Sequence, residues 1–229
     1  MRILITSAAA PLAQQLATAL HNEHEIRLTE RSFVPDLPTL AVSALNHDLS
    51  TNLLVRGLDA IVHVAEPLPT DNEIEQIDYL TRCTYNLYLA AVAEGVKRVV
   101  FLSTLDLMTP YAENYTVGER WRPLPTAATP VLTKHLGEFV SREFAREHKL
   151  DVVVLRLGKV AHTETVANQP FNPLWVDERD VAQAVNRALT MDARLLSTFH
   201  IQSASPQARF SIDSAKNLLG YAPVYDFQK

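Results

Sequence analysis

Short apolar runs alternate with segments of helical periodicity along the first half of the chain, and this alternation limits the fold more strictly than any other feature. A strand that is followed by a helix and then by a further strand is typical of a parallel sheet with crossover helices. We therefore predict an α/β fold built on a doubly wound parallel sheet. The pattern places strands at 2–6, 25–29, 42–46, 60–64 and 97–103, and helices at 11–22, 51–56 and 73–94.

The second half of the chain is less regular. Residues 105–130 are rich in proline and aromatic residues and are predicted to form a long ordered loop, a kind of segment that is usually functional. We assign 1–158 to the sheet-based core and 159–229 to a small C-terminal lobe that packs on it as part of one compact unit. Further elements are predicted at 131–148 (helix), 151–156 (strand), 178–190 (helix), 197–203 (strand) and 211–219 (helix).

Composition narrows the range of partners for this 229-residue chain. The net charge is −5 and Lys and Arg form no run, which argues against nucleic acid and anionic membranes. No apolar run reaches the roughly 18 residues of a membrane span, and the N-terminus shows no leader pattern. The histidines and Cys83 have no ligand spacing, so no metal site is predicted. We expect a cytoplasmic protein whose partner is a small molecule or another protein.

The turn after the first predicted strand contains no glycine. It reads Ser7-Ala8-Ala9-Ala10-Pro11-Leu12-Ala13, and the first glycine of the chain is Gly57. Where such a turn holds a dinucleotide, glycines allow the tight turn, the approach of the pyrophosphate and close helix packing. Helix N-terminal N–H groups need no glycine, although proline lacks its own, so part of an anion site can persist at Ala10, Pro11 and Leu12. We expect dinucleotide binding to be weakened or absent.

Seven further segments carry motifs, among them His47-Asp48-Leu49 and Thr133-Lys134-His135-Leu136-Gly137-Glu138. The others lie at 58–65, 103–104, 155–158, 176–182 and 218–223. Together with the turn, which stands in place of Thr-Gly-x-x-Gly-x-x-Gly, they resemble the extended short-chain dehydrogenase/reductase family of the epimerase/dehydratase type. This resemblance implies a Rossmann-like core and NAD or NADP as the cofactor.

The resemblance also implies which residues contact that cofactor. Glu30 stands where an acid pairs with the adenosine ribose in NAD-dependent members, or it forms a surface ion pair with Arg31. Lys134 holds the nicotinamide ribose, or it is a solvated helix lysine. The expected cofactor set is Ser7, Ala10, Pro11, Leu12, Glu30, Arg31, Asp48, Leu49, Ala65 and Lys134.

The catalytic motif of the resembled family is incomplete. Its chemistry needs a tyrosine four residues before the lysine, on the same helical face, and Pro130 stands at that place. Tyr111 and Tyr115 are candidates for a displaced proton donor, and they serve equally as loop-packing residues. His63 lies on an apolar strand, which favours a role in the core. The candidate catalytic set is Lys134, Thr104, Ser103 and Tyr111.

Two hypotheses of different class follow. The first is a non-catalytic binding or regulatory protein that has lost both the glycine loop and the tyrosine. The second is an active NAD(P)-dependent oxidoreductase, epimerase or dehydratase that acts on a small substrate through a displaced proton donor. Because two independent sites depart together from the family pattern, the sequence favours the first hypothesis.

A homodimer through the helices at 73–94 and 131–148 is expected, since the resembled family often forms dimers in this way. The first of these helices carries a stripe of apolar and small residues that belongs either to the interface or to the core. The stripe consists of Tyr79, Cys83, Asn86, Leu87, Ala90 and Ala91.

Overall fold

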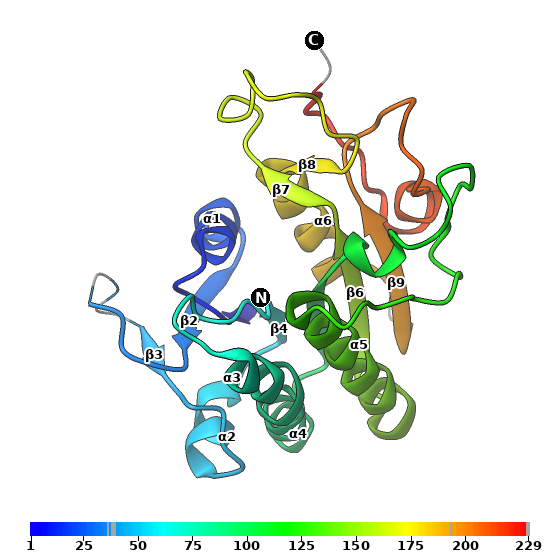
Figure 1. The fold of residues 1–229 in the computed structure, drawn as a ribbon. Coiled ribbons are helices and arrows are strands. Elements are labelled where there is room, and N and C mark those ends of the chain that lie inside the picture. Colours follow the sequence, from blue (N-terminus) through cyan, green and yellow to red (C-terminus); the bar gives the residue numbers. More distant parts are fainter. Residues whose placement is uncertain (36, 38–39, 193, 228–229) are drawn as a thin grey trace.

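A computed structural model describes residues 1–35, 37, 40–192 and 194–227, and it contains a seven-stranded sheet in the order β3-β2-β1-β4-β5-β6-β9 (Figure 1). Every strand pair in this sheet is parallel, which confirms the predicted doubly wound α/β fold. The strands are β1 (Arg2–Ile5), β2 (Glu25–Glu30), β3 (Ala41–Val42), β4 (Ala60–His63), β5 (Arg98–Thr104), β6 (Asp151–Leu157) and β9 (Leu196–Ile201).

Helices cover both faces of the sheet because alternate strand residues point to opposite sides. Ile3 and Ile5 of β1 pack in one core cluster with α1 (Pro11–Leu20) and α6 (Glu178–Thr190). Leu4 packs in a second cluster on the other face, together with residues of the helices that cross there. These helices are α2 (Leu49–Val55), α4 (Thr84–Ala93) and α5 (Thr129–His148).

The single helix predicted at 73–94 is interrupted. It consists of α3 (Glu73–Asp78), a π-helical segment η1 (Tyr79–Cys83) and α4. The stripe of apolar and small residues is buried inside the chain, with no member more than 6% exposed, so it belongs to the core and not to an interface. The apolar side chains that these helices and α5 expose are different ones, among them Ile77, Tyr85 and Phe139.

Several short elements differ from the prediction. The segment predicted as a loop begins with a 3-10 turn, η2 (Leu105–Met108), and the strand predicted at 42–46 is only the two residues of β3. Two strands were not predicted, β7 (Lys159–Ala161) and β8 (Trp175–Asp177), which form a separate parallel pair. Strands of two or three residues are too short to show the alternation of apolar and polar residues by which a strand is predicted. A π-helical turn, η3 (Ala215–Leu219), lies within the last predicted helix.

Helix α5 approaches β5 closely at Gly137. A Cβ atom at this position would lie 2.5 Å from Cζ of the Phe101 ring, far inside van der Waals contact. This close approach brings the preceding turn of α5, which carries Lys134, to the ends of β4 and β5.

We predict that Gly137→Ala destabilises the fold although alanine is the better helix former. Overpacking a core costs about 1–3 kcal/mol, against a helix-propensity gain of about 1 kcal/mol. Urea unfolding measures the difference. Glu147→Ala, at an exposed position of the same helix, should change stability by less than about 0.5 kcal/mol. A Gly137→Ala protein as stable as the unmodified chain would contradict the close packing.

Candidate functional site

A cleft lies at the carboxyl ends of the strands, between the start of α1 and the start of α5. It consists of two adjoining pockets of about 510 and 430 Å³. Ligands of open parallel sheets bind at this edge where the strand order reverses, and here β1 lies between β2 and β4. The residues that line both pockets are Ala10, Pro11, Glu66, Thr104 and Lys134.

Ser7 adopts the left-handed conformation that a glycine would take in this turn, with a φ of 57°. Such a conformation costs a non-glycine residue about 1–2 kcal/mol. The buried side chain offsets this cost, because Ser7 Oγ accepts a hydrogen bond from the Glu66 N–H at 3.0 Å and shares another with the Tyr79 hydroxyl at 2.7 Å. Serine thus ties the turn to the loop after β4 and to η1.

The other two glycine positions of the motif need no special backbone. Ala10 is extended, with φ −72° and ψ 135°, and Ala13 is fully buried in the core. Pro11 takes the first position of α1, where a missing N–H costs nothing. The Leu12 N–H belongs to the first turn of α1, where backbone N–H groups have no acceptor within the helix. It can therefore donate a hydrogen bond to an anion in the cleft.

Glu30 lines the cleft and stabilises the turn. Its carboxylate accepts the Ala9 N–H at 3.1 Å and the Arg31 N–H at 2.8 Å, and the residue is 2% exposed. The Arg31 side chain instead pairs with Asp71, and its guanidinium lies 4.3 Å from the centroid of the Tyr79 ring. The side-chain ion pair considered for Glu30 and Arg31 is therefore replaced by one between Arg31 and Asp71.

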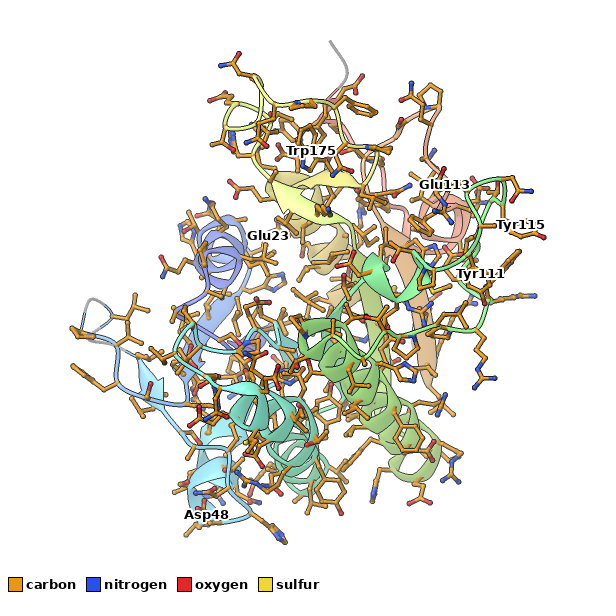
Figure 2. All side chains as sticks on the ribbon, in the orientation of Figure 1. Glu23, Asp48, Tyr111, Glu113, Tyr115 and Trp175 are labelled. Carbon is orange, nitrogen blue, oxygen red and sulfur yellow. The ribbon has the colours of Figure 1, made fainter. Side chains whose placement is uncertain are left out.

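Five residues of the expected cofactor set lie outside the lining of the cleft, namely Ser7, Arg31, Asp48, Leu49 and Ala65. Asp48 caps the start of α2 by accepting hydrogen bonds from Ser50 and Thr51, and Figure 2 shows it beside that helix. Leu49 is 67% exposed beside it, and Ala65 is fully buried after β4. The hydrogen bonds of this cap all end on Oδ1 of Asp48, so the expected adenine contact stays a prediction.

Ser103 and Thr104, at the end of β5, differ in whether their hydroxyl groups can contact a molecule bound in the cleft. Ser103 Oγ donates to Glu138 Oε1 at 2.6 Å, and the same carboxylate forms a buried ion pair with Arg156. Thr104 Oγ1 accepts the Asp106 N–H at 3.1 Å and faces both pockets. Thr104 is thus the hydroxyl that can contact a bound molecule.

Lys134 reaches the floor of the cleft from α5. Its Nζ donates to the backbone carbonyls of Val64 at 3.1 Å and Leu102 at 2.9 Å, and it lies 3.9 Å from Glu66 Oε2. Burial lowers the pKa of this amine to about 8, although the Glu66 carboxylate acts in the opposite direction. The side chain is only 13% exposed, which rules out the alternative of a solvated lysine. Pro130, one turn earlier, lines the first pocket.

The two candidate proton donors do not line either pocket of the cleft. Tyr111 donates to the Arg122 carbonyl at 2.7 Å and packs edge-on against Trp121, with 4.8 Å between ring centroids. Tyr115 is 50% exposed and contacts the same ring. Figure 2 shows both tyrosines on the loop that extends away from α1. Both are therefore packing residues of that loop.

His63 lies in the core between β1 and η1. Thr6 and Thr84 hydroxyls lie 2.8 and 2.9 Å from its two ring nitrogens, and the residue is fully buried. Burial, with a smaller effect from Lys134, lowers the pKa of the imidazole to about 3. The histidine is thus neutral and structural, as the apolar strand indicated.

Sequence reasoning missed three acidic residues of the cleft. Glu66 follows β4, Asp106 lies in η2, and Glu178 begins α6. Their position after the carboxyl end of a strand, or at the start of a helix, was the available signal. Of the predicted set, the cleft brings together Ala10, Pro11, Leu12, Glu30, Ser103, Thr104 and Lys134, but not Ser7, Arg31, Asp48, Leu49, Ala65 or Tyr111.

Comparison with known proteins agrees with this arrangement. The sequence model of the NAD-dependent epimerase/dehydratase family matches residues 3–170. The L-arabinose 1-dehydrogenase (NAD(P)(+)) of Haloferax volcanii is 26% identical in an alignment that covers 97% of this chain and 96% of the relative. The uronate dehydrogenase of Pseudomonas syringae pv. tomato is 27% identical over 82% of this chain and 69% of its own length.

Solved structures show the same fold. Uronate dehydrogenase from Agrobacterium tumefaciens, in a tyrosine-to-alanine mutant complexed with NAD, superposes with a TM-score of 0.83 at 23% identity, over 99% of this chain and 85% of the other. Glucuronic acid dehydrogenase from Chromohalobacter salexigens gives a TM-score of 0.84 at 19% identity over the same shares. Within the described part of the chain, no helix could cross a membrane and no cluster of side chains could hold a metal ion.

We predict a defined order of stability for two variants of Ser7. Both Ser7→Ala and Ser7→Gly remove the partner of the buried Tyr79 hydroxyl and of the partly buried Glu66 N–H, at a cost of about 1–3 kcal/mol. Glycine also relieves the left-handed strain, so Ser7→Gly should be more stable than Ser7→Ala by about 1 kcal/mol. Urea unfolding of the pair checks this. Equal stabilities would show that the turn stores no strain.

Proposed function

The chain belongs to the NAD-dependent epimerase/dehydratase family, and we propose that it is an NAD(P)-dependent oxidoreductase that acts on a small hydroxylated substrate. One observation carries the proposal: Lys134 is held, desolvated, in the same cleft as Glu30 and the start of α1. A lysine without a function in the cleft would be expected in solvent, since burying an ammonium group is costly.

The chemistry of the lining fits a dinucleotide. The first turn of α1 offers N–H groups and the positive end of the helix dipole to the pyrophosphate. Glu30 has carboxylate lone pairs for ribose hydroxyls, and the one position of the Lys134 amine that no backbone carbonyl occupies faces the cleft. When bound, the nicotinamide would supply hydride transfer. Only Ser7 among the motif positions has a left-handed backbone, and its hydroxyl is hydrogen-bonded, so the missing glycines leave the path of the turn intact.

The relatives support the enzymatic hypothesis over the non-catalytic one that the sequence favoured. Two of them are named as dehydrogenases, and one of these matches this chain over nearly its full length. A structural neighbour that carries a tyrosine-to-alanine substitution is described as complexed with NAD. Pro130 remains the observation in favour of the second candidate, a protein that binds a dinucleotide without turning over a substrate.

The charges of the cleft favour an uncharged substrate. Its lining holds one lysine and the carboxylates of Glu30, Glu66, Asp106 and Glu178. A carboxylate on the substrate would be placed among like charges, which is unfavourable in a partly desolvated site. We therefore propose a neutral sugar or polyol of monosaccharide size, in keeping with the volume of the second pocket, about 430 Å³.

We predict that the purified protein binds NAD⁺ more tightly than NADP⁺, because the Glu30 carboxylate would repel a phosphate on the ribose. Titration calorimetry with both cofactors measures the two affinities. Glu30→Gln should reduce the ratio of the NAD⁺ affinity to the NADP⁺ affinity by about tenfold, the equivalent of about 1.4 kcal/mol. Glu147→Gln, at the exposed end of α5, serves as the control. If neither NAD⁺ nor NADP⁺ binds, the proposed function is refuted.

A second prediction concerns substrate charge. Among monosaccharides, neutral aldoses should be oxidised with a kcat/KM at least about tenfold above that of the matching uronates, as expected for about 1.4 kcal/mol of repulsion. Glu178→Gln should reduce this preference. NADH formation followed by absorbance is the measurement. Preference for uronates would contradict the charge argument, whereas cofactor binding without any turnover would favour the non-catalytic candidate.

A further inference from the structure

The cleft has no tyrosine where the resembled family places its proton donor. Pro130 stands there, one helical turn before Lys134, and proline carries no acid–base group. Tyr111 and Tyr115 are held in their loop, away from both pockets. If a hydroxyl group is oxidised in the cleft, its proton has to pass to another residue of the lining. The ionisable side chains there are Lys134 and the carboxylates of Glu30, Glu66, Asp106 and Glu178.

Two backbone carbonyls fix the orientation of the Lys134 amine. A charged lysine has three N–H donors, and the neutral amine has two donors and one lone pair. The carbonyls of Val64 and Leu102 accept two of the donors, at 3.1 and 2.9 Å. The third position of the nitrogen is therefore the one available to the cleft, where Glu66 Oε2 lies 3.9 Å away. This third position carries a proton when the lysine is charged and the lone pair when the amine is neutral.

The surroundings of Lys134 allow both states near neutral pH. Burial lowers the pKa of the amine to about 8, and the Glu66 carboxylate limits the decrease. From β4, the buried His63 faces the lysine, but burial lowers the pKa of this imidazole to about 3, so it adds no charge. The Phe101 ring of β5 lies 6.0 Å from Nζ and carries no ionisable group. Asp106, on η2, lines the same pocket.

We propose that Lys134 is the proton acceptor of the oxidation, in place of the missing tyrosine, and that Glu66 passes the proton to solvent. The inference rests on the proposed oxidoreductase function. As the substrate C–H bond breaks, its hydride goes to an oxidised nicotinamide and the hydroxyl proton goes to the Lys134 lone pair, which leaves a C=O group. The ammonium group then loses its proton to the Glu66 carboxylate, whose side chain is 57% exposed and so can pass the proton on to water.

The titration of Lys134 can be tested without cofactor or substrate. Competitive acetylation with acetic anhydride across a pH series, read by mass spectrometry, gives the midpoint of each lysine. We expect a midpoint near 8 for Lys134, against 10.5 for an ordinary lysine. Glu66→Gln removes the charge that raises this pKa and should move the midpoint to lower pH. Glu143→Gln, on the same helix but outside the cleft lining, should leave it unchanged.

Turnover provides the second measurement. The pH at which the oxidation rate is half-maximal should move to lower pH in Glu66→Gln, together with the labelling midpoint. Lys134→Arg keeps the positive charge but cannot give up its proton, so it should lose at least about a hundredfold in kcat, in the range expected for general acid–base catalysis, and still bind NAD⁺.

The outcomes separate this inference from the proposed function. An ordinary labelling midpoint for Lys134, or a Lys134→Arg variant with nearly full turnover, would overturn the role of Lys134 while the oxidoreductase assignment stands. If the pH of the half-maximal oxidation rate is the same in Glu66→Gln as in the unmodified protein, the role of Glu66 is overturned. An unmodified protein that neither binds NAD⁺ nor oxidises any of the sugars would overturn the proposed function, and this inference with it.

Discussion

The arrangement of the cleft depends on the hydrogen bonds between the Lys134 ammonium group and two backbone carbonyls at the ends of neighbouring strands. Val64 O lies just beyond β4 and Leu102 O lies in β5, and a buried amine is acceptable there because these acceptors replace water. Helix α5 can bring the lysine to this place only because Gly137 lets it rest against the Phe101 ring. The packing of α5 on the sheet thus decides where the positive charge of Lys134 lies in the cleft.

The glycine-free turn between β1 and α1 is the second feature that shapes the cleft. Its sequence suggested an eroded cofactor loop, since three glycines were missing together. The structure shows that these positions differ in what they require: only Ser7 has a left-handed backbone, and its hydroxyl bonds to Tyr79 and to the loop after β4. Glu30 stabilises the same turn through the Ala9 N–H. The loss of a glycine motif therefore does not by itself imply the loss of the fold or of the anion site.

The alternation of apolar runs and helical periods predicted the sheet because each buried strand of this fold is long enough to show its pattern. The same reasoning could not find β7 and β8, which have three residues each, or the π-helical segment that breaks the long helix. For the cleft, the sequence identified Lys134, Glu30 and Thr104 through their positions at strand ends and in a helix. It did not reveal that Asp48 caps α2, and it overlooked Glu66, for which the position just after the end of β4 was the only signal.

The most direct test of the central claim is a crystal structure of the protein grown with a saturating concentration of NAD⁺. The account predicts electron density for a dinucleotide along the cleft, with its pyrophosphate at the start of α1 and its nicotinamide beside Lys134. An empty cleft at saturating concentration, or a dinucleotide bound at another surface, would contradict it.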